Sequence, residues 1–280
     1  MLYYEGKNCI IIKLVNFYTL IPYNINNRGF DNFMIISKDN SKYKMWLKLS
    51  QKKYRQKEQL FLVEGEHLVF EAKKAGVLID VLVCEGISFD IDAYITYLAK
   101  PLFEKLVSTV TSAGVMAVCR ILESSIKKNN RLLLVDGIRD PGNLGTLIRS
   151  ALAFGFDGLV LSEDTVDIYN EKVVRATQGA IFNLAISRRN LVDYIAILEN
   201  LGVVVYATTL SDDAMVIDDV MPADCMAFIV GSEGAGIRES LVEASDGNVV
   251  IEMSSLVESL NVGVAGSILM HHFNGLRQVG

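Results

Sequence analysis

Three polar loops in the C-terminal half of the chain carry the side chains best suited to chemistry. Each follows an aliphatic run, and together they supply amide, guanidinium, carboxylate and hydroxyl groups. The residues are Asn143 and Arg149 in segment 140–149, Glu233 in the glycine-rich loop 231–236, and Ser259 and Asn261 in segment 259–262. Loops that follow parallel strands meet at one edge of a sheet, so we expect these side chains to share a site.

Each loop, taken alone, also has a purely structural interpretation. Asn143 and Asn261 stand where a helix cap belongs, and Arg149 could be an ordinary surface residue. The glycine loop could be a tight turn, although glycines also leave backbone N–H groups open to a ligand. Coincidence explains three such loops poorly, so their co-occurrence favours a binding site.

The glycine loop lacks two common nucleotide signatures. Gly231 and Gly236 have Walker A spacing, but Ile237 and Arg238 follow where a lysine and a hydroxyl residue are required. The dinucleotide pattern lacks its third glycine. A nucleotide-dependent enzyme is therefore the least favoured class.

The composition fits two packed domains without a metal site. The chain has 280 residues, 51% of them hydrophobic. Its formal net charge of −6 argues against a uniformly basic surface, so any contact with a nucleic acid would have to come from a local patch. The four cysteines have no Cys-x-x-Cys spacing and the three histidines are scattered, which predicts reduced thiols and no bound metal.

The C-terminal part, residues 131–280, alternates aliphatic runs with helical stretches. The predicted strands are 132–135, 159–161, 203–206, 227–230 and 249–251, and the predicted helices are 143–154, 171–177, 191–201, 237–244 and 261–273. This alternation predicts an α/β fold with a mostly parallel sheet and helices on both faces.

Residues 34–121 predict a smaller α/β domain. Its strands are expected near 60–63, 78–84 and 115–119, with helices over 66–74 and 101–107. The polar, aperiodic stretch 122–130 is the predicted linker.

A basic stretch opens this domain. Eight lysines and arginines lie between residues 38 and 57, with Asp39 as the single acid, and an apolar side accompanies them. This pattern predicts a helix with one basic face. We predict phosphate contacts for Lys48, Lys52, Lys53 and Arg55, the alternative being a solvated helix face.

Residues 1–33 are irregular, and we interpret them as an extension outside the fold, disordered or preceding the native start. An extra strand docked on the first domain is the alternative. The apolar segment 9–23 falls short of the roughly 20 residues that span a bilayer. It also lacks a signal-peptide cleavage pattern, so we expect a soluble cytoplasmic protein without a membrane partner.

The ordered loops resemble the three motifs of the SpoU (TrmH-like) branch of the knotted SPOUT methyltransferases. The likeness covers segments 136–155, 229–237 and 251–269 in turn. Residues 48–120 further resemble that family's substrate-binding domain, which is similar to the L30e fold. Among branches, the chain looks most like the bacterial rRNA-directed proteins that carry this extra domain.

The resemblance implies a fold, a cofactor and a reaction. The fold would contain a trefoil knot and form a homodimer, and the cofactor would be S-adenosylmethionine. The implied catalytic residues are Asn143, Arg149, Glu233, Ser259 and Asn261, and the implied cofactor-binding residues are Thr208, Gly231, Gly236, Ile251 and Leu260. The reaction would be methyl transfer to a ribose 2′-hydroxyl of RNA, with 23S rRNA favoured. A tRNA 2′-O-methyltransferase and an inactive RNA-binding ribosome assembly factor are the alternatives.

The residue types limit the mechanism. The site set contains no histidine, cysteine or lysine to act as a base at neutral pH. A guanidinium stays protonated in proteins, so Arg149 cannot readily accept a proton. We predict that Arg149 binds the RNA phosphate beside the target ribose and stabilises charge on the attacking oxygen.

Overall fold

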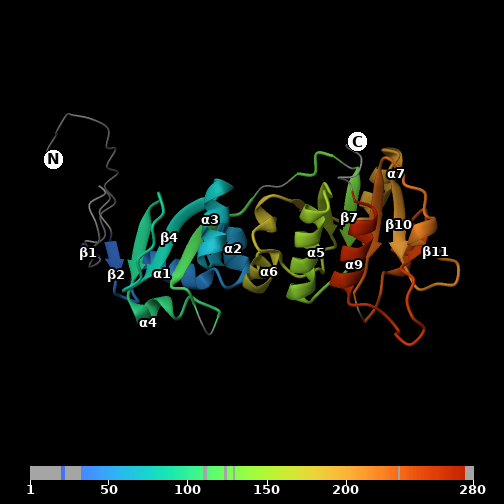
Figure 1. Ribbon diagram of the computed structural model, residues 1–280. Coiled ribbons are helices and arrows are strands. Elements are labelled where there is room, and N and C mark those ends of the chain that lie inside the picture. The colour runs from blue at the N-terminus through green and yellow to red at the C-terminus, as the bar shows by residue number, and fades with distance from the viewer. Residues whose placement is uncertain are drawn as a thin grey trace.

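The computed structural model contains two α/β domains that lie side by side (Figure 1). It describes residues 20–22, 33–109, 112–122, 125–128, 130–232 and 234–274. Each domain has its own sheet, and helix α6 lies between the two sheets. The three polar loops of the sequence analysis all belong to the C-terminal domain, whose first strand is β7 (Arg131–Val135).

The N-terminal domain contains a mixed sheet in the order β1-β2-β5-β4-β6-β3. The strands are β1 (Leu20–Pro22), β2 (Phe33–Ile35), β3 (Leu60–Glu64), β4 (Leu78–Cys84), β5 (Ile95–Leu98) and β6 (Val115–Arg120). Strands β2, β5 and β4 run parallel, whereas β1 pairs antiparallel with β2 and β6 pairs antiparallel with both β4 and β3. The sequence pattern predicts β3, β4 and β6 but misses β2 and β5.

Four helices complete this domain: α1 (Ser41–Lys48), α2 (Lys52–Glu58), α3 (Glu66–Lys74) and α4 (Lys100–Phe103). The prediction of one continuous basic helix is wrong, because the chain breaks between α1 and α2. Arg55 explains the break: its Nη1 donates to the carbonyl oxygens of Leu49 and Ser50, both at 2.8 Å. The carbonyl oxygens of the C-cap Leu49 and of the following Ser50 are therefore satisfied without a further helical turn.

The C-terminal domain contains a seven-stranded sheet in the order β11-β13-β10-β12-β7-β8-β9, and all neighbouring strands in it run parallel. The strands are β7 (Arg131–Val135), β8 (Gly158–Leu161), β9 (Ala185–Arg188), β10 (Val204–Thr208), β11 (Met215–Val216), β12 (Met226–Val230) and β13 (Gly247–Val250). The predicted parallel sheet is confirmed, and β9 and β11 are additions to it.

Helices cover both faces of this sheet, as predicted. They are α5 (Pro141–Ala153), α6 (Glu171–Thr177), α7 (Leu191–Asn200), α8 (Glu239–Glu243) and α9 (Val262–His272), with 3₁₀ turns at Ala180–Phe182 and Ile217–Asp219. Alternate residues of β7 show the division. Leu133 and Val135 belong to the core that contains α5, α6 and α9, whereas Leu132 and Leu134 pack on the α7 and α8 side.

The structure describes parts of the predicted N-terminal extension and of the predicted linker. Leu20–Pro22 pairs with β2, which corresponds to the alternative of a docked strand for these three residues; the other predicted extension residues, 1–19 and 23–32, lie outside the described part of the structure. Residues 125–128 form no helix or strand. The domain boundaries and the trefoil knot stay predictions. No helix among the described residues is long and apolar enough to cross a membrane.

Candidate active site

The first and third motif loops meet through their asparagines. Nδ2 of Asn261 donates to Oδ1 of Asn143 at 2.9 Å, although 118 positions separate them in the chain. Close packing of α5 against α9 brings them together: a Cβ at Gly266 would stand 2.3 Å from Cδ2 of Leu147, so a larger residue there would displace that side chain. Oγ of Ser150 and Oγ of Ser267 are 2.8 Å apart along the same helix pair.

Asn261 caps its helix, whereas Asn143 does not. Asn261 is the N-cap of α9, because its Oδ1 accepts from the N–H groups of Gly263 at 2.9 Å and Val264 at 3.3 Å. The N-cap of α5 is Asp140, whose Oδ1 accepts from the N–H of Asn143 at 2.8 Å. The capping interpretation of Asn143 is therefore wrong, and its amide side chain is directed to Asn261 instead.

A cavity of about 460 Å³ opens at the carboxyl ends of β10, β12 and β13. All five residues predicted to bind the cofactor line it, as does Ser259, although it was predicted as catalytic. They are Thr208, Gly231, Gly236, Ile251, Leu260 and Ser259. Asn261 follows Leu260 directly in the chain, so the Asn143–Asn261 pair lies beside this cavity. No charged side chain of the described residues lines it.

The glycine loop makes a narrow closed turn at the mouth of this cavity. The N–H groups of Ser232 and Gly236 donate to each other's carbonyl oxygens, at 3.1 and 2.9 Å. A Cβ at Gly231 would stand 2.2 Å from the backbone of Gly236, so a side chain there cannot be accommodated without shifting the loop. Gly236 has φ +67°, a conformation that favours glycine. Glu233, the predicted acid of this loop, lies outside the described residues.

Arg149 lies on α5 but not on the side that faces Asn261. It is exposed, and it follows Asn143 by six residues, which turns its side chain by about 120° from that of Asn143. Its neighbour on the same exposed side is Leu152, three residues further on, which is 37% exposed. Within one copy of the described chain, Arg149 therefore does not join the asparagine pair.

Arg55, predicted to contact RNA, is buried instead and connects the two domains. It is 6% exposed, and its Nη2 donates to Oδ2 of Asp167 at 2.6 Å. Asp167 lies 112 positions away, in the loop before α6. The prediction of a phosphate contact fails because the guanidinium is already bound to Asp167 and to two carbonyls of its own domain.

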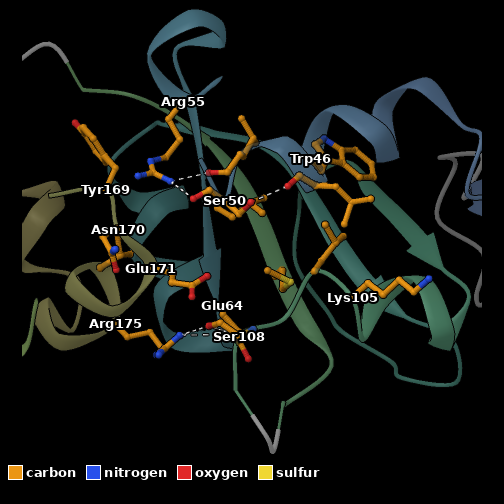
Figure 2. Close-up of a pocket in the computed structure, with 16 residues that line it drawn as sticks. Trp46, Ser50, Arg55, Glu64, Lys105, Ser108, Tyr169, Asn170, Glu171 and Arg175 are labelled. Carbon is orange, nitrogen blue, oxygen red and sulfur yellow. Dashed lines mark hydrogen bonds and ion pairs between the residues drawn. The ribbon is translucent and has the colours of Figure 1, made fainter. Parts of the chain in front are cut away.

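Arg55 borders a second cavity, of about 290 Å³, at the seam between the domains (Figure 2). Figure 2 shows Tyr169, Asn170, Glu171 and Arg175 entering from the C-terminal domain, with Glu64 and Ser108 from the N-terminal domain. Arg175 donates to Oγ of Ser108 and lies 3.9 Å from Oε2 of Glu64. The charged groups around this cavity include two arginines that already have partners in the facing domain.

The three predicted RNA-contact lysines remain at the surface. Lys48, Lys52 and Lys53 are all exposed on α1 and α2. The ammonium groups of Lys48 and Lys53 lie 5.5 and 4.9 Å from the ring centroid of Tyr54, so an aromatic ring accompanies the charges. This combination is typical of surfaces that bind single-stranded nucleic acid.

Sequence reasoning missed one polar contact beside the cavity at the carboxyl ends of β10, β12 and β13. Asp136 directly follows β7 and is 2% exposed, and its carboxylate accepts from Arg238, the second residue after the glycine loop 231–236. The available signal was an acidic residue at the carboxyl end of a buried aliphatic strand, where side chains reach a ligand site.

Two protein-family models match the chain. The model of the SpoU rRNA methylase family matches residues 130–271, and the model of the MRM3-like substrate-binding domain matches residues 40–117. The chain therefore belongs to the SpoU rRNA methylase family. Its second matched domain coincides with the region that contains the exposed lysines.

Individual relatives agree with this assignment. The chain is 40% identical to the 23S rRNA (guanosine(2553)-2′-O)-methyltransferase RlmP of Bacillus subtilis, over 86% of this chain and 99% of that protein. A solved RNA 2′-O ribose methyltransferase is 27% identical with a TM-score of 0.74, covering 88% of this chain and 98% of its own. An AdoMet-bound rRNA methyltransferase from Sinorhizobium meliloti, 24% identical with a TM-score of 0.77 over 88% of this chain and 98% of its own, has the same fold.

Proposed function

We propose that this protein transfers a methyl group from S-adenosylmethionine to the ribose 2′-hydroxyl of a guanosine in 23S rRNA. The observation that carries the proposal is the meeting of the first and third motif loops, through Asn143 and Asn261, beside the cavity lined by the second. The identity to RlmP over 99% of that enzyme's length supports 23S rRNA and guanosine as the target. It disfavours the tRNA enzyme and the inactive assembly factor.

The cavity fits S-adenosylmethionine in size and chemistry. Ligand sites of this kind span about 300–1,000 Å³ and combine apolar walls with a few polar groups. Here Ile251 and Leu260 supply apolar surface for an adenine ring, and Gly231 and Thr208 supply backbone groups and a hydroxyl. The bound cofactor supplies a reactive methyl group on a sulfonium sulfur.

The remaining residues would position the ribose and stabilise charge. The paired amides of Asn143 and Asn261 are accessible for orienting the sugar, and Ser259 lies at the cavity wall. Arg149 would bind the adjacent phosphate and stabilise the negative charge that builds on the attacking 2′-oxygen. The hydroxyl proton would pass to a phosphate oxygen or to water, because the proposed site residues include no histidine, cysteine or lysine that could act as a base at neutral pH.

A homodimer would bring Arg149 into this arrangement. Three apolar side chains are exposed on α5 and α9: Leu152 at 37%, Val264 at 48% and Ile268 at 38%. Val264 and Ile268 are four residues apart and share one face of α9, and Arg149 lies on the same exposed side of α5 as Leu152. We propose that a second copy covers this surface, so that Arg149 of one protomer serves the site of its partner.

The test is methyl transfer from labelled S-adenosylmethionine to unmodified 23S rRNA and to a tRNA pool, with the purified full chain. We expect label in 23S rRNA, located in a guanosine. Label found in tRNA but not in 23S rRNA would show that the substrate is tRNA. Binding of the cofactor without transfer to either RNA would favour the assembly-factor alternative. Mixing Arg149→Ala with the cofactor-site variant Gly231→Ala should restore activity if Arg149 acts on the partner's site.

A further inference from the structure

Asp136 is attached to both ends of the glycine loop. Its own N–H donates to the carbonyl oxygen of Val230 at 2.9 Å, at the point where the chain leaves β12 and enters the loop. Its Oδ2 accepts from the N–H of Arg238 at 2.9 Å, at the point where the chain leaves the loop and enters α8. One residue at the end of β7 therefore fixes the entry and the exit of residues 231–237.

The side chain of Arg238 reinforces the exit contact. Its Nε donates to Oδ1 of Asp136 at 2.8 Å, and its Nη2 donates to the same oxygen. Asp164 lies further from this guanidinium, at 3.8 Å, and its side chain is 52% exposed. The carboxylate of Asp136 is buried, whereas the Arg238 side chain is 55% exposed, so only the Asp136 side of this pair is shielded from water.

The loop held in this way forms one wall of the cofactor cavity. Gly231, Ser232, Gly236 and Ile237 all line that cavity. Because Ser232 and Gly236 exchange two backbone hydrogen bonds, a shift at the exit of the loop is transmitted to its entry. The position of the loop's N–H groups therefore depends on where Arg238 is held.

We infer that Asp136 is a positioning residue for S-adenosylmethionine: it does not line the cavity, and it sets the loop that does. This inference rests on the proposed function. Loss of the carboxylate leaves β7 and β12 paired but frees the exit of the loop. The consequence is weaker cofactor binding, with the RNA-binding surface unchanged.

Asp157 offers a matched control at the opposite end of the same strand. Its Oδ2 accepts from the N–H groups of Asn130 at 2.9 Å and Arg131 at 3.1 Å, where β7 begins. Asp136→Asn and Asp157→Asn therefore make the same chemical change at the two ends of β7. The second change lies away from the cofactor cavity.

The experiment is calorimetric titration of S-adenosylmethionine into the full-length wild type, Asp136→Asn and Asp157→Asn, with steady-state kinetics on 23S rRNA. For Asp136→Asn we expect an affinity loss of about 10- to 100-fold, because the charge-assisted bonds are removed. The KM for the cofactor should rise in proportion, with the KM for RNA unchanged. Asp157→Asn should lower the midpoint of thermal unfolding but bind the cofactor like the wild type.

Arg238→Lys and Arg238→Met provide a second route if Asp136→Asn fails to fold. Arg238 is more than half exposed, and its backbone N–H remains in both variants. Lysine should retain more affinity than methionine. Wild-type affinity in Asp136→Asn, or in Arg238→Met where Asp136→Asn does not fold, would overturn the inference, as would an equal loss in Asp157→Asn. Absence of cofactor binding by the wild type would instead overturn the proposed function, and with it this inference.

Discussion

Two cavities among the described residues are built from opposite kinds of side chain. The cavity at the carboxyl ends of β10, β12 and β13 has no charged side chain among its described lining residues. The cavity between the domains is bordered by charged groups, but Arg55 and Arg175 are bound across the seam. The first leaves backbone groups and hydroxyls for a ligand, whereas the second uses its arginines to hold two domains together.

This difference shows that charge alone is a poor guide to a binding site. Arg55 belongs to the most basic stretch of the chain, yet its partner is a carboxylate of the other domain. The glycine loop, residues 231–236, contains no cation, yet it has the close backbone approach that a ligand site requires. What separates the two cavities is whether their polar groups are already satisfied.

The largest effect is expected from Arg149→Ala. Removal of the guanidinium should lower kcat by about 100- to 1,000-fold, because charge on the attacking oxygen is no longer stabilised. Cofactor affinity and thermal unfolding should stay as in the wild type, since Arg149 is exposed and does not line the cofactor cavity. Single-turnover methyl transfer and calorimetry measure the two quantities, and full activity of the variant would contradict the assigned role.

Gly231→Ala tests the claim that the cofactor cavity depends on backbone approach. The added Cβ would stand 2.2 Å from Gly236, so the loop must move, and we expect cofactor affinity to fall by at least about tenfold. Gly234→Ala is the matched control, because a Cβ at that position meets nothing within 4 Å. Equal binding by the two variants would show that the loop is not a rigid wall of the site.

Asp80 tests a buried carboxylate whose neighbouring cation, Lys42, is exposed. Burial raises its pKa from 3.8 to about 6, despite Lys42 at 3.8 Å and hydrogen bonds from Thr96. The folded state therefore holds more protons than the unfolded state between about pH 4 and 6, and stability falls as the pH rises through that window. Asp80→Asn should remove this dependence and raise the free energy of unfolding above about pH 6 by about 3 kcal/mol. Denaturant titrations at about pH 4 and pH 7 measure it, and an unchanged pH profile would contradict the shift.

Asp167→Asn tests whether the seam depends on its ion pair. The variant leaves the buried Arg55 without its carboxylate, and we expect the free energy of unfolding to fall by about 2 kcal/mol. The KM for RNA should rise, since the lysines on α1 and α2 are no longer held in a fixed position, while cofactor affinity should not change. Asp39→Asn is the control, because its pair with Lys44 is exposed to solvent and should contribute little to stability. A stability loss in Asp39→Asn equal to that in Asp167→Asn would refute the distinction.

The smallest effect is expected from Lys52→Ala combined with Lys53→Ala. Both lysines are exposed, so stability should hold. Removal of each phosphate-binding lysine should reduce the slope of log affinity against log salt by about 0.7 to 0.9. Fluorescence anisotropy with an rRNA fragment at several salt concentrations measures this slope. An unchanged slope would show that the two lysines are solvated and do not contact RNA phosphates.

Much of the C-terminal domain could be predicted from its local pattern. The helix Glu171–Thr177 was predicted to the residue, because helix period and polar flanks define it locally. Strands β9 and β11 were missed: β9 has four residues and ends in an arginine that binds loop carbonyls, and β11 has two. Short strands of this kind depend on neighbours that local patterns do not reveal.

The site residues divide in the same way. The convergence of Asn143 and Asn261 follows from the placement of loops after parallel strands, so it could be anticipated. The burial of Arg55 depends on Asp167, 112 positions away, and the bonds of Asp136 depend on Arg238, 102 positions away. The position of Asp136 after an aliphatic strand indicates a site but not its partner, and the pattern around Arg55 looks the same whether an arginine is solvated or paired.

The decisive measurement is nucleoside mass spectrometry of 23S rRNA from cells with and without this gene, with the rRNA also treated in vitro by the purified protein. We predict that one 2′-O-methylguanosine disappears without the gene, that the protein restores it, and that fragmentation leaves the methyl group on the sugar. A restored methyl group that stays with the base, or no change in the ribose-methylated nucleosides, would contradict the function proposed for this protein.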